Sequence, residues 1–99
     1  MALRPKVTKE IFSHKHIKDN GDIIDIKIEH IEINRQYPEG IRYSLSYIKD
    51  GKTILRYDNH AGHPHHKHFG GKRKSYEFKD EWRLISDFEE DLKKLGIEM

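Results

Sequence analysis

Alternating hydrophobic and polar positions divide the first part of the chain into two strands joined by a tight turn. Residues 11–18 and 22–34 are rich in β-branched side chains and flank Asn20-Gly21, a dipeptide typical of hairpin turns. In the second range the apolar positions change phase near residues 29 and 30. Because one extra residue moves all later side chains to the other face of a strand, this change predicts a β-bulge.

A second hairpin is predicted around Asp50-Gly51, between residues 41–47, which alternate without interruption, and residues 53–58. A two-residue turn would mix large apolar and charged side chains on both faces. A three-residue loop over residues 49–51, with Gly51 in the left-handed region, gathers the apolar groups on one face instead. We therefore predict these pairs: Tyr43 with Tyr57, Leu45 with Leu55, Tyr47 with Thr53, Arg42 with Asp58, and Ser44 with Arg56.

The C-terminal part of the chain predicts an amphipathic helix that begins after Asp80 as N-cap and ends at Gly96. Its apolar stripe, with spacings of three and four residues, is Trp82, Ile85, Phe88, Leu92 and Leu95. Trp82 is expected in the core, and the acidic run 89–91 on a solvated face. A short strand over residues 74–79 precedes the helix.

These elements together predict an α+β fold. It has an antiparallel sheet of four to five strands, arranged as β-hairpin, β-hairpin and short strand, with the C-terminal helix packed on one face. The other face of the sheet is expected to be free. We expect a single domain over residues 1–99, in which residues 1–9 are either disordered or an edge segment.

Composition narrows the function classes only a little. Nineteen Lys and Arg against seventeen Asp and Glu give a net charge of +2, so total charge does not identify a nucleic-acid binder. The absence of cysteine excludes disulfides and thiolate metal sites and favours an intracellular setting. No apolar run is long enough to span a bilayer, and the N-terminal residues lack a signal-peptide pattern. We expect a cytoplasmic protein that does not bind membranes.

The segment 59–73 is the candidate functional loop, because five of the eight histidines lie between His60 and His68. Imidazole can transfer protons near neutral pH and can bind zinc or nickel. If the chain is extended at residues 66–68, His66 and His68 point to one side and Lys67 to the other. Three interpretations stay open: a solvated loop that binds metal adventitiously, an acid/base site, and a physiological metal site.

The acid/base interpretation assigns proton transfer to His66 and His68. Asp58 would orient one imidazole, and Asn59 would bind either the substrate or the backbone. Cations for phosphate binding are Arg56, Lys67, Lys72 and Arg73. The metal interpretation uses His63, His65, His66 and His68 as ligands, whereas the acid/base interpretation requires no cofactor. Tyr37 could stack on a base, but packing on the sheet edge is the commoner role of a turn aromatic.

From Asn20 onward the chain resembles the TumE-like toxins of toxin–antitoxin modules. The shared motifs are Tyr43-Ser44-Leu45-x-Tyr47, the Asp50-Gly51 turn, Tyr57-Asp58-Asn59, His66-Lys67-His68, Gly70-Gly71, Tyr76-x-Phe78 and Asp87-Phe88-x-x-Asp91. The most specific of them is the spacing from Tyr-Asp-Asn to His-x-His. His66, His68, Asp58 and Asn59 match the family's histidines and Asp-Asn pair. His60, His63 and His65 fall where relatives commonly carry charged or small residues, so the resemblance implies no function for them.

The resemblance implies a small toxin that is encoded beside a helix-turn-helix antitoxin and inhibits growth through RNA. We therefore expect a metal-independent ribonuclease in which His66 and His68 act as general base and acid, while Lys67 and Arg73 stabilise the transition state. Partners would be the antitoxin, RNA and a second copy in a homodimer. The alternatives are a non-catalytic protein-binding module and a histidine-ligated metal-binding protein.

Overall fold

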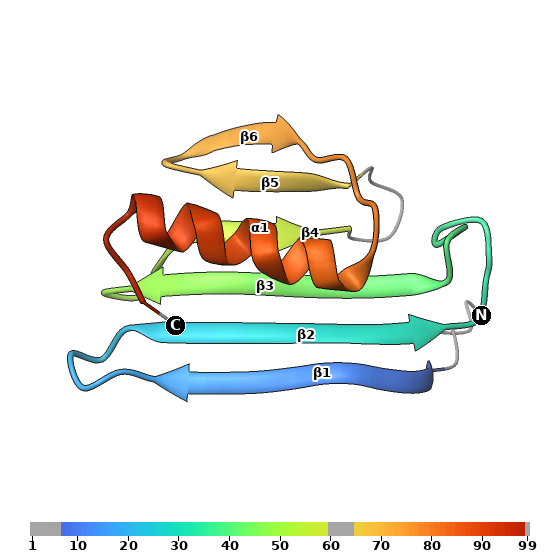
Figure 1. Ribbon diagram of the computed structural model, residues 1–99, viewed down its shortest axis with the longest axis horizontal. Helices are drawn as coiled ribbons and strands as arrows, with labels where there is room; N and C mark the ends of the chain where they lie inside the picture. The colour runs from blue at the N-terminus through green and yellow to red at the C-terminus, as the bar shows by residue number, and fades with distance from the viewer. Residues whose placement is uncertain (1–6, 60–64, 99) are drawn as a thin grey trace.

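The computed structural model describes residues 7–59 and 65–98, which form one antiparallel sheet and one helix (Figure 1). Strands that follow each other along the chain are also neighbours in the sheet, in the order β1-β2-β3-β4-β5-β6. The elements are β1 (Val7–Ile17), β2 (Ile23–Ile31), β3 (Ile41–Lys49), β4 (Lys52–Asp58), β5 (His66–Phe69), β6 (Lys72–Ser75) and α1 (Glu81–Lys94). The predicted α+β class with a C-terminal helix is confirmed.

The sheet has six strands in the described part of the chain, rather than the predicted four to five, because residues 66–75 form a third hairpin. Gly70 and Gly71 turn this hairpin with φ angles of 58° and 79°, a backbone that glycine adopts without strain. The strand predicted over residues 74–79 is therefore wrong in its bounds. The chain leaves the sheet after Ser75 and runs to the helix without further strand.

The predicted three-residue loop between β3 and β4 is also wrong. Asp50 and Gly51 both have positive φ angles, of 52° and 73°, as in a two-residue turn that pairs Lys49 with Lys52. A register shift beyond this turn leaves Ile54 without a partner in β3. The resulting pairs are Ser44 with Asp58, Leu45 with Tyr57, Ser46 with Arg56, and Tyr47 with Leu55. Because of this bulge, the large apolar side chains of β3 and β4 point to the same face of the sheet. The predicted apolar face is therefore right, although the predicted pairs are wrong.

The β-bulge that the sequence predicts in β2 is found instead in β1, the strand that pairs with it. The β2–β3 pairing runs from Ile23 to His30 without a shift, whereas both shifts of the β1–β2 pairing are on the β1 side, after Val7 and after Glu10. The side chains of β2 alternate regularly between the two faces of the sheet. The apolar positions change phase because Ile31 is buried on the face opposite to that of Ile28. The strand ends at Ile31, short of the predicted end at residue 34.

Helix α1 packs on one face of the sheet, across β3 and β4 (Figure 1). The buried core between them comprises Ile24, Ile26, Ile28, Ile41, Tyr43, Leu45, Tyr47, Leu55, Tyr57, Leu84, Phe88 and Leu92. Asp80 caps the helix as predicted, since its side chain accepts a hydrogen bond of 2.7 Å from the backbone N–H of Arg83. Gly96 follows the C-cap with a φ of 77°.

Two side chains of the helix differ from prediction. The Trp82 side chain is exposed, at 67%, and Leu84 takes the core position in the first turns. Asp91, expected on a solvated face, is only 3% exposed. At 100° per residue the buried stripe centres on Leu84, Phe88 and Leu92, so that Trp82 falls outside it and Asp91 falls within it.

On the opposite face of the sheet, no helix is formed by the residues that the structure describes (Figure 1). Leu55 and Tyr57 of β4 point to the helix, so Arg56 and Asp58 point away from it. We call this second side the open face. Within the described residues, no helix combines the length and the apolar character needed to cross a bilayer.

Candidate functional site

The β4–β5 pairing assembles the candidate site on the open face. Asp58 lies opposite His66, and Arg56 lies opposite His68. Since directly paired residues of antiparallel strands point to the same face, all four side chains share the open face. The pairings continue as two adjacent rows across the sheet: Lys27, Ser44, Asp58, His66 and Ser75 in one, and Asp25, Ser46, Arg56, His68 and Arg73 in the other.

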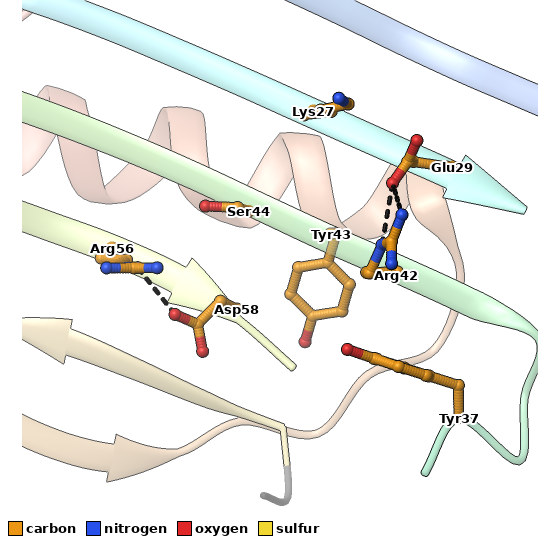
Figure 2. A pocket seen from close by; sticks show the side chains of 8 residues that line it. All are labelled: Lys27, Glu29, Tyr37, Arg42, Tyr43, Ser44, Arg56 and Asp58. Atoms are coloured by element: carbon orange, nitrogen blue, oxygen red, sulfur yellow. Dashed lines mark hydrogen bonds and ion pairs between the residues drawn. The ribbon is translucent and has the colours of Figure 1, made fainter. Parts of the chain in front are cut away.

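The Asp58 carboxylate lies at the centre of this site and is largely buried. Its Oδ1 is 2.9 Å from Nε2 of His66, and its Oδ2 is 2.6 Å from Nε of Arg56 (the latter contact in Figure 2). Among the described residues, neither Arg56 Nε nor Asp58 Oδ1 has a well-aligned hydrogen bond, so these contacts are primarily electrostatic. One carboxylate therefore links a guanidinium and an imidazole.

The contact with Asp58 orients the His66 ring, with Nε2 toward the carboxylate. A carboxylate only accepts hydrogen bonds, so Nε2 is assigned a proton whether the ring is neutral or cationic. The ring of His68 lies with its centroid 5.1 Å from that of His66, at an interplanar angle of 82°. His68 is the more exposed of the two imidazoles.

The predicted phosphate-binding cations are divided between the two faces. Arg73 lies opposite His68 and so shares the open face with Arg56. Lys72 lies opposite Phe69, on the helix side of the edge hairpin. Lys67 also points to the helix side, as its position between two histidines predicts. The site on the open face thus contains two of the four predicted cations.

Lys67 is part of a polar cluster beneath the helix. Its Nζ is 2.9 Å from Oδ2 of Asp91 and 5.4 Å from the centre of the Tyr57 ring. The Tyr57 hydroxyl donates a hydrogen bond to the same carboxylate oxygen. Burial raises the pKa of Asp91, but the hydrogen bonds from Tyr57 and Lys67 outweigh it, so the net pKa lies below the ordinary value. Lys67 therefore holds β5 to the helix.

Asn59 binds the backbone, which is one of the two roles predicted for it. Its side-chain oxygen accepts a hydrogen bond of 2.9 Å from the N–H of Tyr43, and its Nδ2 donates one of 2.8 Å to the carbonyl of Ile41. The amide thereby extends the pairing between β4 and β3 by one step. Asn59 is buried, so its side chain is committed to this structural role.

His65 lies apart from the other two described loop histidines. Its Nδ1 is 2.8 Å from the Tyr43 hydroxyl, its Nε2 contacts the Glu39 carboxylate, and its ring stacks on Phe78 with centroids 5.1 Å apart. Burial raises the pKa of Tyr43, which therefore stays protonated. Both ring nitrogens of His65 thus have protein partners.

The predicted metal ligands are not assembled by the described residues. Within residues 7–59 and 65–98, no group of three or more His, Asp or Glu side chains is arranged to hold a metal ion. His60 and His63 lie outside the described residues. The metal interpretation, which depends on His63 for one of its ligands, stays a prediction.

A hollow of about 400 Å³ lies on the open face (Figure 2), and Asp58, which lines it, contacts His66. It is lined by Lys27, Glu29, Tyr37, Arg42, Tyr43, Ser44, Arg56 and Asp58. The predicted pairing of Arg42 with Asp58 is wrong. The guanidinium of Arg42 contacts Glu29 of β2 instead, with Nη2 at 2.6 Å from Oε1. Tyr37 packs against the sheet and is nearly buried, in agreement with the commoner role of a turn aromatic.

Comparison with known proteins places the chain in a family. A family model described as Toxin TumE matches residues 3–95, which is nearly the whole chain. No curated protein and no solved structure matches it.

Proposed function

The chain belongs to the TumE toxin family, and on this basis we propose that it is the toxin of a toxin–antitoxin module and acts as an endoribonuclease on the open face of its sheet. Its activity would be held in check by a helix-turn-helix antitoxin encoded nearby, and its RNA target would be cytoplasmic. The proposed reaction is attack of a ribose 2′-hydroxyl on the adjacent phosphate. It forms a 2′,3′-cyclic phosphate and releases a 5′-hydroxyl, so it requires one general base and one general acid.

The observation that carries this proposal is the pair His66 and His68, whose ring centroids are 5.1 Å apart on one face of the sheet. Two imidazoles at this spacing can contact one phosphodiester from two directions, one removing the 2′-hydroxyl proton and the other protonating the leaving oxygen. Asp58 orients His66 through the contact with its Nε2.

Charge stabilisation would come from Arg56 and Arg73, which lie on either side of His68 in one row across the sheet. Guanidinium groups suit this role because they bind phosphate oxygens with two parallel hydrogen bonds. Lys67, which the sequence suggested for it, points to the helix side and binds Asp91. We therefore assign Lys67 a structural role.

The proposal is tested by expressing the protein without its antitoxin in wild-type and His66→Ala, His68→Ala double-mutant forms. The matched control is the double change His14→Ala, His16→Ala, which removes two exposed histidines of β1. Wild type and control should arrest growth and fragment RNA, whereas the first double mutant should do neither. Growth arrest and RNA cleavage that persist unchanged in that mutant, with its fold verified by circular dichroism, would overturn the proposal.

A protein-binding toxin without catalysis is the second candidate, favoured by the low exposure of the His66 side chain, at 8%. A group so enclosed reaches a substrate less readily than an exposed one. This candidate predicts growth arrest with intact RNA, proportional to the amount of toxin, and capture of a host protein that is unaffected by either histidine change.

A further inference from the structure

We propose that the hollow over β2, β3 and β4 binds the nucleobase whose ribose supplies the attacking 2′-hydroxyl, and that Glu29 and Arg42 select guanine there. This inference rests on the proposed ribonuclease function and adds a base specificity to it. It assigns a role to the polar residues of the open face that the proposed chemistry does not use.

The hollow and the histidine pair are parts of one surface, because Asp58 belongs to both. Asp58 lines the hollow and contacts His66, and its row continues through Ser44 to Lys27 on the far side of the hollow. Neighbouring strands lie roughly 5 Å apart, so the middle of the hollow, over β3, is about 10 Å from β5. One ribose and its base can cover this span when the phosphate lies over the histidines.

The size of the hollow suits a small ligand rather than a flat macromolecular contact. Its volume of about 400 Å³ falls in the range of small-molecule pockets. Tyr37 borders one end, while Arg56 and Asp58 border the other (Figure 2). A base extruded from single-stranded RNA could enter from the open side, as in other sequence-selective RNA binders.

Glu29 gives the hollow a buried carboxylate. Its side chain is only 8% exposed, although desolvation makes such burial costly. Both contacts of Arg42 go to one oxygen: Nε donates a hydrogen bond of 2.8 Å to Oε1, and Nη2 is 2.6 Å from the same atom. Oε2 takes neither contact. In a bidentate ion pair, two guanidinium nitrogens would contact both carboxylate oxygens. Here both contacts go to Oε1, so the Oε2 acceptor of Glu29 lies beside the guanidinium donors of Arg42.

This pattern of groups matches guanine. On its Watson–Crick edge guanine has two adjacent donors, N1–H and the N2 amino group, beside the acceptor O6. A carboxylate can accept from both donors, and a neighbouring guanidinium can donate to O6. Adenine, cytosine and uracil each offer at most one donor on the part of this edge that would face Glu29. Lys27 and Arg56, on either side of the hollow, can bind the flanking phosphates.

The test uses guanosine 3′-monophosphate, with the corresponding adenosine, cytidine and uridine nucleotides as competitors. Calorimetry of the wild-type protein should show guanosine 3′-monophosphate binding on the order of tenfold more tightly than the others. Glu29→Gln should abolish this preference, because an amide replaces one acceptor by a donor. The control Glu32→Gln, at an exposed position just beyond β2, should retain it. Equal binding of all four nucleotides, or a guanine preference that survives Glu29→Gln, would overturn the inference.

Two further measurements keep the test decisive. If Glu29→Gln loses its fold by circular dichroism, Glu29→Asp replaces it, since the shorter side chain keeps the charge but withdraws the acceptors from the base. Binding is also measured on His68→Ala. This variant should keep the guanine preference although it no longer cleaves RNA, because His68 lies outside the hollow. In wild type, a guanine preference without RNA cleavage refutes the proposed enzyme alone, whereas cleavage 3′ of any base equally refutes the guanine site alone.

Discussion

The Asp58 carboxylate lies 2.9 Å from Nε2 of His66, across the pairing of β4 and β5. Both residues are buried, and Asp58 also lines the open hollow. This contact orients one of the two imidazoles to which the proposed function assigns proton transfer. Because Asp58 touches Arg56 as well, its removal affects both charge and orientation.

Asp58→Asn should lower kcat while leaving KM nearly unchanged. The amide can donate to His66 as well as accept from it, so the preference for a proton on Nε2 is lost. General acid–base catalysis by a positioned side chain contributes about 100-fold to 10,000-fold in rate, so the loss should not exceed this range. Initial rates of cleavage of a short RNA provide the measurement, and Asp25→Asn, an exposed carboxylate of the neighbouring row, is the control. Equal rates for Asp58→Asn and wild type would show that the contact does not orient a catalytic group.

Trp82 and Phe88 should differ sharply in their effect on stability. Phe88 is fully buried between helix and sheet, so Phe88→Ala should lower the free energy of unfolding by about 3–5 kcal/mol. Trp82→Ala removes an exposed ring and should change it by no more than about 0.5 kcal/mol. Urea unfolding followed by circular dichroism measures both. Because Trp82 is the only tryptophan, its fluorescence should also be quenched readily by iodide; a protected, blue-shifted emission would contradict its exposed position.

Much of this fold can be predicted from the local periodicity of the sequence. The predictions are wrong where contacts between segments distant in the sequence determine the structure. The helix, its caps and the common face of Leu45 and Tyr57 depend on spacings within single segments. The hairpin of β5 and β6 was missed in part because β6 is wholly exposed and shows no alternation. The β3–β4 register depends on the bulge at Ile54, whose benefit appears only when both strands lie against the helix.

The same distinction applies to the candidate site. His66 and His68 could be placed on one side from their spacing alone, and Asp58 joins them because β5 resumes close after β4. The ion pair between Glu29 and Arg42 was not predicted, because the two residues belong to different strands and their contact depends on the β2–β3 register. An arginine that alternates with core residues beside a glutamate in the preceding strand is a pattern that would have suggested the pair.

Acid should destabilise the protein through Asp91. The pKa of this carboxyl is held below its ordinary value of 3.8, mainly because the hydrogen bonds from Tyr57 and Lys67 outweigh the effect of burial. Around pH 3.8 the unfolded chain therefore binds more protons than the native one. The stabilising contribution is complete above this pH and is lost as pH falls through the lower native pKa. Unfolding measured between neutral pH and pH 3 should show a steeper loss in wild type than in Asp91→Asn; parallel curves would exclude Asp91 as a source of acid sensitivity.

Lys67→Met should reduce stability without impairing the chemistry of the folded protein. The change keeps a long apolar side chain over Tyr57 but leaves the Asp91 carboxylate without its ammonium partner, 2.9 Å away. Loss of one partner of a buried charge-assisted contact costs about 1–3 kcal/mol. RNA cleavage per folded molecule should change little, because Lys67 points to the helix side.

Lys72→Met, at an exposed position on the same side, is the matched control. The double mutant Lys67→Met, Asp91→Asn should recover part of the lost stability, since it removes the unpaired charge. A large fall in kcat for Lys67→Met at unchanged stability would instead indicate that Lys67 stabilises the transition state, as the sequence analysis predicts.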